Sequence, residues 1–233
     1  MENAKNRKLF IEGERFRPKL RAGNTLEDKN WMKRFVLGIT GSMGGGKSTV
    51  TKIFESLGAF RISSDEIARQ FTSGDSPVKN EIIELLGHEV LDELGNLDRK
   101  KIAGIVFSDK NAIAKLNELM HPLIRKKTLA LIESITNGRI IAWEAPLLFE
   151  AGGDSICNAT LTVFAEYEQA WSRVYKRDEI TEEEFRSRLA NQMDIKKKLE
   201  ASDFRIVNDR DLRHLELECS AIYNEIMNRK IIP

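Results

Sequence analysis

The sequence predicts an α/β protein whose parallel sheet has helices on both faces. Short apolar runs alternate along the chain with segments of helical periodicity, as in strands joined by crossover helices. A glycine-rich stretch at residues 41–46 lies between the first apolar run and the first helical segment. At 233 residues the chain is long enough to bury one large core.

Residues 1–31 differ in composition from the rest of the chain. They are polar and charged, and their apolar residues follow no sustained period. We expect a weakly ordered N-terminal extension, or a leader that precedes a start at Met32. A docking arm is a less favoured alternative, because nothing in the segment carries chemistry. The folded domain is expected at residues 32–233.

Five short apolar runs are predicted to be strands. The first two flank a helical segment that ends at Gly58, a residue type that commonly follows a helix. The predicted strands cover residues 35–40, 59–62, 139–143, 161–165 and 205–207.

The stretch between the second and third strands, residues 65–135, has helical character and no convincing strand. It includes a helix around residues 112–120. We expect this helix to stop before His121 and Pro122, because the residue before a proline disfavours helical geometry.

A second helical stretch covers about residues 168–199. Within it, Thr181 and Glu184 have the spacing of a capping box, which marks a helix start. The last helix presents an apolar face from Leu212 to Ile226.

The charges of the chain are balanced, with 37 Lys and Arg residues against 36 Asp and Glu residues. This balance gives no reason to propose nucleic acid as a partner, because nucleic-acid binders usually have a strong basic excess. No apolar run approaches the roughly 20 residues that a membrane span requires. We therefore expect neither partner.

The two cysteines, Cys157 and Cys219, are far apart and fit no metal-binding spacing, so we expect buried thiols rather than a disulfide framework or a zinc cluster. A reducing compartment is the default for such a chain. The N-terminus has no apolar core of a secretory signal, and Glu2, Glu12 and Glu14 argue against a transit peptide. A cytoplasmic location is expected by elimination.

Residues 41–48 match the phosphate-loop pattern G-x-x-x-x-G-K-[ST] in full, between a predicted strand and a predicted helix. Glycines let the backbone wrap with its N–H groups inward, and the helix N-terminus adds positive potential. Lys47 can reach the β- and γ-phosphates of a nucleotide, and the Ser48 hydroxyl can bind Mg²⁺. A chance glycine-rich turn is the disfavoured alternative. The candidate nucleotide-binding residues are Gly41, Gly44, Gly45, Gly46, Lys47, Ser48 and Thr49.

The loop predicts binding of a nucleoside triphosphate without naming the reaction. The guanine-reading Asn-Lys-x-Asp motif of GTPases is absent, as are the His-Arg-Asp and Asp-Phe-Gly motifs of protein kinases. The small-molecule kinases remain as the main class.

Asp65 follows the second predicted strand, at the sheet edge where ligands bind in open α/β folds. A carboxylate there can accept the proton of an attacking hydroxyl. Arg69 lies one turn later and can meet a substrate phosphate. A helix N-cap is the alternative role for Asp65, and an ion pair with Asp65 is the alternative for Arg69.

Arg173 and Arg177 lie four residues apart on a predicted helix that can close over a transferring phosphoryl group. A solvated basic face is the alternative for both. Such a face is also the interpretation of residues 196–198, three consecutive lysines. His121 is a lone histidine, a residue type that is more often structural than catalytic in this setting.

Several segments are more specific than the phosphate loop. In chain order they are Ser64-Asp65-Glu66-Ile67-Ala68-Arg69, His121-Pro122-Leu123-Ile124, Pro146-Leu147-Leu148-Phe149-Glu150, Gln192 and Ile206-Val207-Asn208. Together with the loop they resemble the dephospho-CoA kinase family over about residues 36–208.

This resemblance implies a P-loop kinase-like fold with a helical acceptor domain and a helical lid. It implies transfer of the γ-phosphoryl group of ATP, with Mg²⁺, to the ribose 3′-hydroxyl of dephospho-CoA, the last step of coenzyme A biosynthesis. The expected parts are a nucleotide core at residues 32–64, 136–167 and 201–233, an acceptor insertion at residues 65–135, and a lid at residues 168–200.

The resemblance also implies residue roles, with Asp65 as the general base. The expected catalytic residues are Asp65, Lys47 and Arg173. The expected acceptor-binding residues are Asp65, Arg69, His121 and Arg177. Asn208 is expected near the adenine of ATP, and Ser48 is expected to bind the metal.

Three positions depart from the family pattern. Ser63 stands where the family usually has an aspartate, and Glu144 stands where many members carry Asp. Arg210 replaces a glycine near Asn208, so the loop on the adenine side is expected to differ.

Two other functions stay open at this point. One is a different small-molecule kinase, for example one acting on a nucleoside or nucleotide. The other is a nucleotide-dependent binding protein that has lost catalysis, against which Lys47, Asp65 and the arginine pair count. The sequence does not indicate an oligomeric state.

Overall fold

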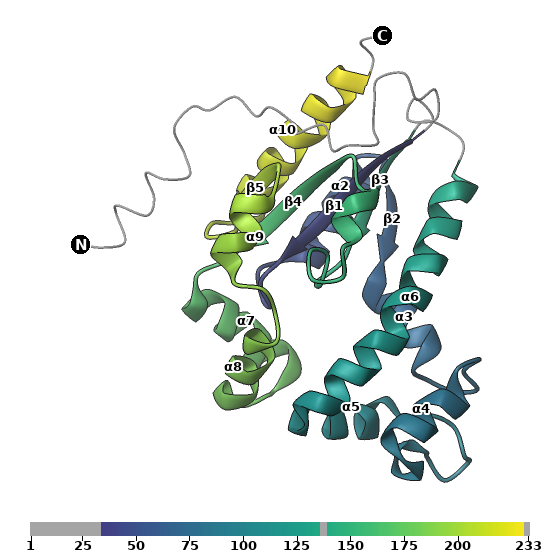
Figure 1. Ribbon diagram of the computed structural model, residues 1–233. Coiled ribbons are helices and arrows are strands. Elements are labelled where there is room, and N and C mark those ends of the chain that lie inside the picture. The colour runs from purple at the N-terminus through teal and green to yellow at the C-terminus, as the bar shows by residue number, and fades with distance from the viewer. Residues whose placement is uncertain (1–33, 136–138, 231–233) are drawn as a thin grey trace.

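The computed structural model describes residues 34–135 and 139–230 of the chain (Figure 1). The predicted N-terminal extension, residues 1–31, and the proposed start at Met32 lie outside the described residues.

The core of the molecule is a five-stranded, fully parallel sheet with the strand order β2-β3-β1-β4-β5. The strands are β1 (Arg34–Gly41), β2 (Phe60–Ser63), β3 (Arg139–Glu144), β4 (Ala159–Phe164) and β5 (Phe204–Val207). All five lie at the predicted places within one or two residues. The predicted α/β class is confirmed, and the carboxyl ends of β1, β2 and β3 meet at one edge of the sheet.

Helices connect the strands and extend beyond the sheet. They are α2 (Lys47–Ser56), α3 (Ser64–Phe71), α4 (Lys79–Leu86), α5 (Arg99–Ser108), α6 (Lys110–Ser134), α7 (Tyr167–Asp178), α8 (Glu182–Ala190), α9 (Ile195–Ala201) and α10 (Leu212–Lys230), with short 3-10 turns η2 (His88–Val90) and η3 (Gly153–Ile156). Figure 1 shows α4, α5 and the start of α6 in one lobe, and α7 with α8 in another.

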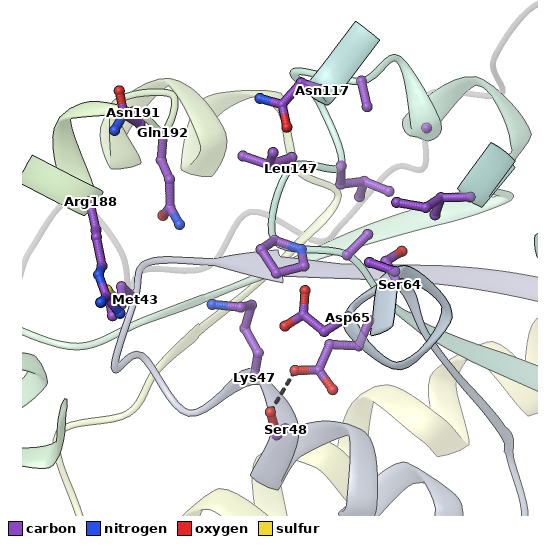
Figure 2. Close-up of a pocket in the computed structure, with 18 of the residues that line it drawn as sticks. Met43, Lys47, Ser48, Ser64, Asp65, Asn117, Leu147, Arg188, Asn191 and Gln192 are labelled. Atoms are coloured by element: carbon purple, nitrogen blue, oxygen red, sulfur yellow. Dashed lines mark hydrogen bonds between the residues drawn. The ribbon is translucent and has the colours of Figure 1, made fainter. Parts of the chain in front are cut away.

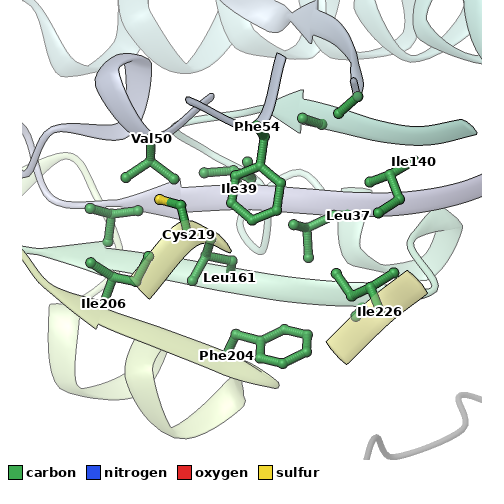
Figure 3. Packing of buried hydrophobic residues seen from close by; sticks show 14 of the residues in the cluster. Leu37, Ile39, Val50, Phe54, Ile140, Leu161, Phe204, Ile206, Cys219 and Ile226 are labelled. Atoms are coloured by element: carbon green, nitrogen blue, oxygen red, sulfur yellow. The ribbon is translucent and has the colours of Figure 1, made fainter. Parts of the chain in front are cut away.

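Alternation along the strands gives the sheet two buried faces. On one face, Leu37 and Ile39 of β1 pack with Phe54 of α2 and Cys219 of α10 (Figure 3). On the other face, the neighbouring Val36 packs with residues of β2, β3, α3 and α6. The central strands β1 and β4 are therefore buried on both sides, which explains why their runs are mostly apolar and do not alternate with charged residues.

Helix α6 contradicts one prediction from the sequence. It runs from Lys110 to Ser134 and passes through His121 and Pro122, where a stop was expected. A proline inside a helix costs about 3 kcal/mol, because it removes one hydrogen bond and crowds the preceding turn. Two hydrophobic clusters offset this cost, since α6 packs against α4 and α5 before the proline and against the sheet after it.

The connection from β4 to β5 consists of three helices, α7, α8 and α9. The predicted capping box at the start of α8 is confirmed: the Thr181 hydroxyl accepts from the Glu184 N–H, and the Glu184 carboxylate accepts from the Thr181 N–H. Val174 of α7 and Phe185 of α8 form a small core that also contacts Met43 of the phosphate loop. The two helices therefore pack on the loop itself.

No helix within the described ranges is long and apolar enough to cross a bilayer.

Burial of both cysteines gives a first testable prediction. Cys157 and Cys219 form no disulfide and are fully buried, and burial raises the pKa of the Cys219 thiol to about 12. Because thiolate is the reactive form, we expect neither cysteine to react with Ellman's reagent at neutral pH in the native protein. Both are expected to react after denaturation. Rapid modification of either thiol in the native protein would contradict this packing.

Candidate active site

A cavity of about 740 Å³ lies where β1, β2 and β3 end (Figure 2). Five segments line it: the phosphate loop with the start of α2, the start of α3, the middle of α6, the segment after β3, and α7 with the end of α8. Among the predicted site residues, the cavity wall includes Gly44, Gly46, Lys47, Ser48, Thr49, Asp65, His121, Arg173 and Arg177. Gly41, Gly45, Arg69 and Asn208 are not part of the wall.

The phosphate loop has a conformation that requires glycine. Gly44 and Gly46 have φ values of 75° and 98°, in the region that residues with side chains rarely adopt. A Cβ atom on Gly44 would lie 2.4 Å from the carbonyl oxygen of Ala170 in α7. The loop is closed by a hydrogen bond from the Gly45 N–H to the Ser42 carbonyl, 3.0 Å. It is therefore shaped both by its own turn and by close contact with α7.

The Lys47 ammonium lies over this loop and donates to the carbonyl oxygens of Gly41 at 3.2 Å and Ser42 at 2.8 Å. Burial, with a contribution from the nearby Lys198 cation, lowers the pKa of Lys47 to about 8, whereas Asp65 and Glu144 act in the opposite direction. At neutral pH Lys47 is mostly protonated. It can present a poorly hydrated positive charge to phosphate oxygens.

Ser48 and Glu144 form a pair of oxygen ligands beside Lys47. The Ser48 hydroxyl donates to the Glu144 carboxylate at 2.6 Å (Figure 2), and Glu144 is only 3% exposed. Hydroxyl and carboxylate oxygens are the protein ligands that suit Mg²⁺. Within residues 34–135 and 139–230, no cluster of three or more His, Cys, Asp or Glu side chains forms a complete metal site.

The structure contradicts the helix-cap alternative for Asp65. The N-cap of α3 is Ser63, whose hydroxyl accepts from the Glu66 N–H at 3.3 Å. The indole N–H of Trp143 donates to the Ser64 hydroxyl at 2.9 Å and fixes this turn against β3. The Asp65 side chain is consequently free of a capping role, and it points into the cavity near Lys47 (Figure 2).

Arg69 lies one turn beyond Asp65 on the exposed side of α3. The ion pair with Asp65 that was considered as an alternative is absent from the part of the chain that the structure describes. Arg69 also stays outside the cavity wall, so its predicted contact with the acceptor remains a prediction.

Arg173 and Arg177 line the cavity but have different partners. The Arg173 guanidinium donates to the carbonyl oxygens of Gly44 at 3.4 Å and Asn208 at 3.0 Å, so it joins the phosphate loop to the end of β5. The solvated-face alternative is therefore wrong for Arg173. Arg177 is exposed and makes two 2.7 Å hydrogen bonds with Asp178. That carboxylate raises the pKa of Arg177, and Asp65 adds to the effect.

Asn208 is buried behind the phosphate loop. Its side-chain amide donates to the Gly45 carbonyl at 2.9 Å, and its own N–H donates to Phe164 at 2.7 Å. Asn208 therefore positions the loop from β5. The neighbouring Arg210, a departure from the family pattern, is exposed with its nearest acidic partner, Asp209, at 3.9 Å.

His121 lines the cavity from the middle of α6. Its Nε2 atom is buried and has no hydrogen-bond partner among the described residues. Burial lowers the pKa of His121, while the Glu150 carboxylate opposes the shift. His121 is therefore a neutral side chain at neutral pH with one nitrogen available to a bound molecule.

The dephospho-CoA kinase family model matches residues 35–214. A dephospho-CoA kinase of Leptospira interrogans is 41% identical over 199 residues, which cover 85% of this chain and 96% of the relative. That of Aquifex aeolicus is 34% identical, covering 84% of this chain and 98% of the relative.

The chain belongs to the dephospho-CoA kinase family.

Solved structures agree with this assignment. The dephospho-CoA kinase from Campylobacter jejuni matches with a TM-score of 0.54 and 28% identity, covering 83% of this chain and 98% of that structure. A shikimate kinase from Acinetobacter baumannii, at 16% identity and a TM-score of 0.50, covers 87% of this chain and 98% of that structure, and it shares the fold alone. The predicted P-loop kinase-like fold is confirmed.

The predicted solvated face at residues 196–198 is wrong for Lys198. The three lysines at 196–198 were expected to be a solvated face, yet Lys198 is fully buried. Its ammonium lies 2.9 Å from a Glu150 carboxylate oxygen and 2.7 Å from the Pro146 carbonyl. The signal was present in the sequence, since Lys198 follows Ile195 by three residues and precedes Leu199, which places it on the inner face of α9.

Sequence reasoning also missed residues of the cavity wall that no motif marks. They are Arg188 of α8 and Asn191 of the turn that follows it. Asn117 of α6 and Gln192, which is one of the positions that carry the resemblance, also line the cavity, although no role was predicted for either.

The contact between the phosphate loop and α7 gives a second prediction. Gly44→Ala adds left-handed strain and a clash with Ala170, so we expect a weaker ATP affinity, by about tenfold or more, and a lower Tm. Gly152→Ala is the matched control, because Gly152 also has a positive φ, 63°, but nothing lies within 4 Å of its added Cβ. Calorimetric titration with Mg-ATP measures the difference; equal ATP affinities in the two variants would contradict this contact.

Proposed function

We propose that this protein transfers the γ-phosphoryl group of ATP to the ribose 3′-hydroxyl of dephospho-CoA, giving CoA and ADP. One observation carries the proposal: a single cavity holds the phosphate loop with Lys47 at one end and Asp65 with the helical wall of α6 beside it. Membership of the dephospho-CoA kinase family supplies the acceptor.

The nucleotide end is formed by the phosphate loop and the N-terminus of α2. Backbone N–H groups of Gly44 and of residues 46–49, together with the helix dipole, favour the phosphates of ATP, and Lys47 adds a positive charge. The Asn208 side chain donates to the Gly45 carbonyl and the Arg173 guanidinium donates to the Gly44 carbonyl, so both side chains hold the loop through its carbonyl groups. We assign Arg173 to this positioning role, with the adenine expected on the Asn208 side.

Ser48 and Glu144 would hold Mg²⁺, which supplies charge neutralisation for the phosphates when it is bound. The buried Glu144 carboxylate already accepts from Ser48, so both oxygens lie on the same side of the loop. Glu144 extends further from β3 than the aspartate of many family members would. It also lies 4.0 Å from Arg61, which balances its charge.

Asp65 is the proposed general base. In the transfer step its carboxylate accepts the proton of the 3′-hydroxyl, the hydroxyl oxygen forms a bond to the γ-phosphorus, and the bond between that phosphorus and the bridging oxygen of ADP breaks. Lys47 and Arg177 face this region and stabilise the charge on the transferring group. The wall of α7 and α8 keeps water from the site, which limits hydrolysis of ATP.

The acceptor end is formed by α6 and the segment after β3. Leu116, Met120 and Leu147 give it an apolar surface, while His121 and Asn117 offer hydrogen-bonding groups. A mixed surface of this kind suits an acceptor with a nucleoside and a long flexible arm. Arg69 lies outside the wall, so we assign it to a part of the acceptor that extends beyond the cavity.

We keep the predicted division of the chain as part of this proposal: a nucleotide core at residues 32–64, 136–167 and 201–233, an acceptor part at residues 65–135, and a lid at residues 168–200. The two thiols form no disulfide, which fits the reducing cytoplasm in which we place the enzyme.

Acceptor-dependent ADP release tests the function directly. We expect Mg-ATP to give ADP at a high rate only when dephospho-CoA is present, and the product to gain the mass of one phosphate group. Shikimate and nucleosides serve as control acceptors. A folded protein that binds ATP but releases no ADP with dephospho-CoA would overturn the proposed acceptor, and release with another acceptor would identify a different small-molecule kinase.

Asp65→Asn tests the general base. We expect kcat to fall by about 10²-fold or more while the Kd for ATP changes little, because the amide cannot accept the proton. Glu66→Gln is the matched control: it alters the next carboxylate on the same turn, which is paired with Arg61 at 2.6 Å instead of facing the cavity. Steady-state kinetics of both variants decide the matter, and an unchanged kcat in Asp65→Asn would reject this base.

A further inference from the structure

The buried ammonium of Lys198 joins three parts of the structure. The backbone carbonyl of Lys198 accepts hydrogen bonds from the Thr162 hydroxyl of β4 and from the Ser202 hydroxyl, which fixes α9 against the sheet. Its side chain reaches the segment after β3, where it meets the Pro146 carbonyl and the Glu150 carboxylate. The Pro146 carbonyl also accepts from the Thr40 hydroxyl at the end of β1, 3.2 Å away.

Glu150 extends this connection to the turn between α8 and α9. The same carboxylate oxygen that meets Lys198 accepts from the Met193 N–H at 2.7 Å. Asn191 and Gln192, the two residues before Met193, belong to the cavity wall. Figure 2 shows the Gln192 side chain extending toward the centre of the cavity from this turn.

Stability alone does not explain why Lys198 and Glu150 form an ion pair at this place. Burying an ammonium group is costly unless it is paired and hydrogen-bonded, and a well-packed apolar side chain usually serves a core equally well. Lys198 has both a carboxylate and a carbonyl partner, so the cost is offset, but the arrangement gains directionality that an apolar side chain lacks. Fixed geometry is therefore the property that the pair adds.

We propose that the Lys198–Glu150 pair is a positioning element that holds the Asn191–Met193 turn, and with it Gln192, at the acceptor end of the cavity. The proposal rests on the proposed function for the identity of the acceptor. Lys198 itself is fully buried, so it acts through the turn and does not touch the substrate.

The first test compares two lysines of the same helix. Lys198→Met keeps the length of the side chain but removes the charge and both hydrogen bonds, and we expect KM for dephospho-CoA to rise about tenfold or more while the Kd for ATP stays within about twofold. Lys197→Met is the matched control, because Lys197 is exposed. An unchanged acceptor KM in Lys198→Met would overturn the proposal.

A second variant separates positioning from stability. Glu150→Gln added to Lys198→Met removes the remaining charge, so we expect Tm to recover relative to the less stable single variant. The acceptor KM is expected to stay high, because no charged pair then links Pro146, Glu150 and the turn. Joint recovery of Tm and KM would mean that the pair is merely structural.

The link to Gln192 has its own test. If Lys198 acts through this side chain, Gln192→Ala raises the acceptor KM by itself, and the combination with Lys198→Met is no worse than about the larger single effect. Independent, multiplicative effects would overturn that route.

Hydrogen exchange makes the result independent of the acceptor's identity. The Met193 amide is expected to exchange slowly in the native chain and about tenfold or more faster in Lys198→Met, with no change in Lys197→Met. If the native protein has no activity with dephospho-CoA but the variants show this exchange pattern, the proposed function is rejected and the positioning of the turn is retained. Equal exchange in all three proteins would reject the turn contact itself.

Discussion

Close backbone contact between the phosphate loop and α7 is the constraint on which the site depends. Gly44 lies so near Ala170 that no side chain fits between them, and Arg173 and Asn208 then bind the carbonyl groups of the loop. The Gly45 N–H closes the loop turn, and the loop carbonyls are used on this outer side, so the remaining N–H groups of the loop can face a ligand. Met43 packs into the core of α7 and α8, so the loop and the lid form one unit.

Helix α6 has a comparable role on the acceptor side. Its two halves belong to different hydrophobic clusters, one with α4 and α5 and one with the sheet, and His121 lies where the halves meet. A helix that is packed at both ends keeps the acceptor wall at a defined distance from the phosphate loop. Productive transfer requires such control, because reacting atoms must be held within a few tenths of an ångström.

Charge is concentrated around the cavity in a way that matches its proposed ligands. Lys47 comes from the start of α2, and Arg173 and Arg177 come from α7. Asp65 follows β2, and Glu144 is the last residue of the neighbouring strand β3. Asp65, Glu144, Arg177 and the buried Lys198 all act on the pKa of Lys47, so these groups share one electrostatic environment. Positive groups surround the place where phosphates would lie, and the carboxylates lie where a metal and a hydroxyl would be bound.

Contiguous patterns determined the features that depend on neighbouring residues: the strands, the phosphate loop at residues 41–48, and the capping box at Thr181. The phosphate-loop turn and the capping box are specified by hydrogen bonds within a few residues, and the strands are recognised by short apolar runs. Only the tertiary structure decided that Ser48 meets Glu144, 96 residues away, and that Pro122 lies inside a helix. It also decided that Lys198 is buried, because its partners come from a distant segment and the cost of burial depends on them.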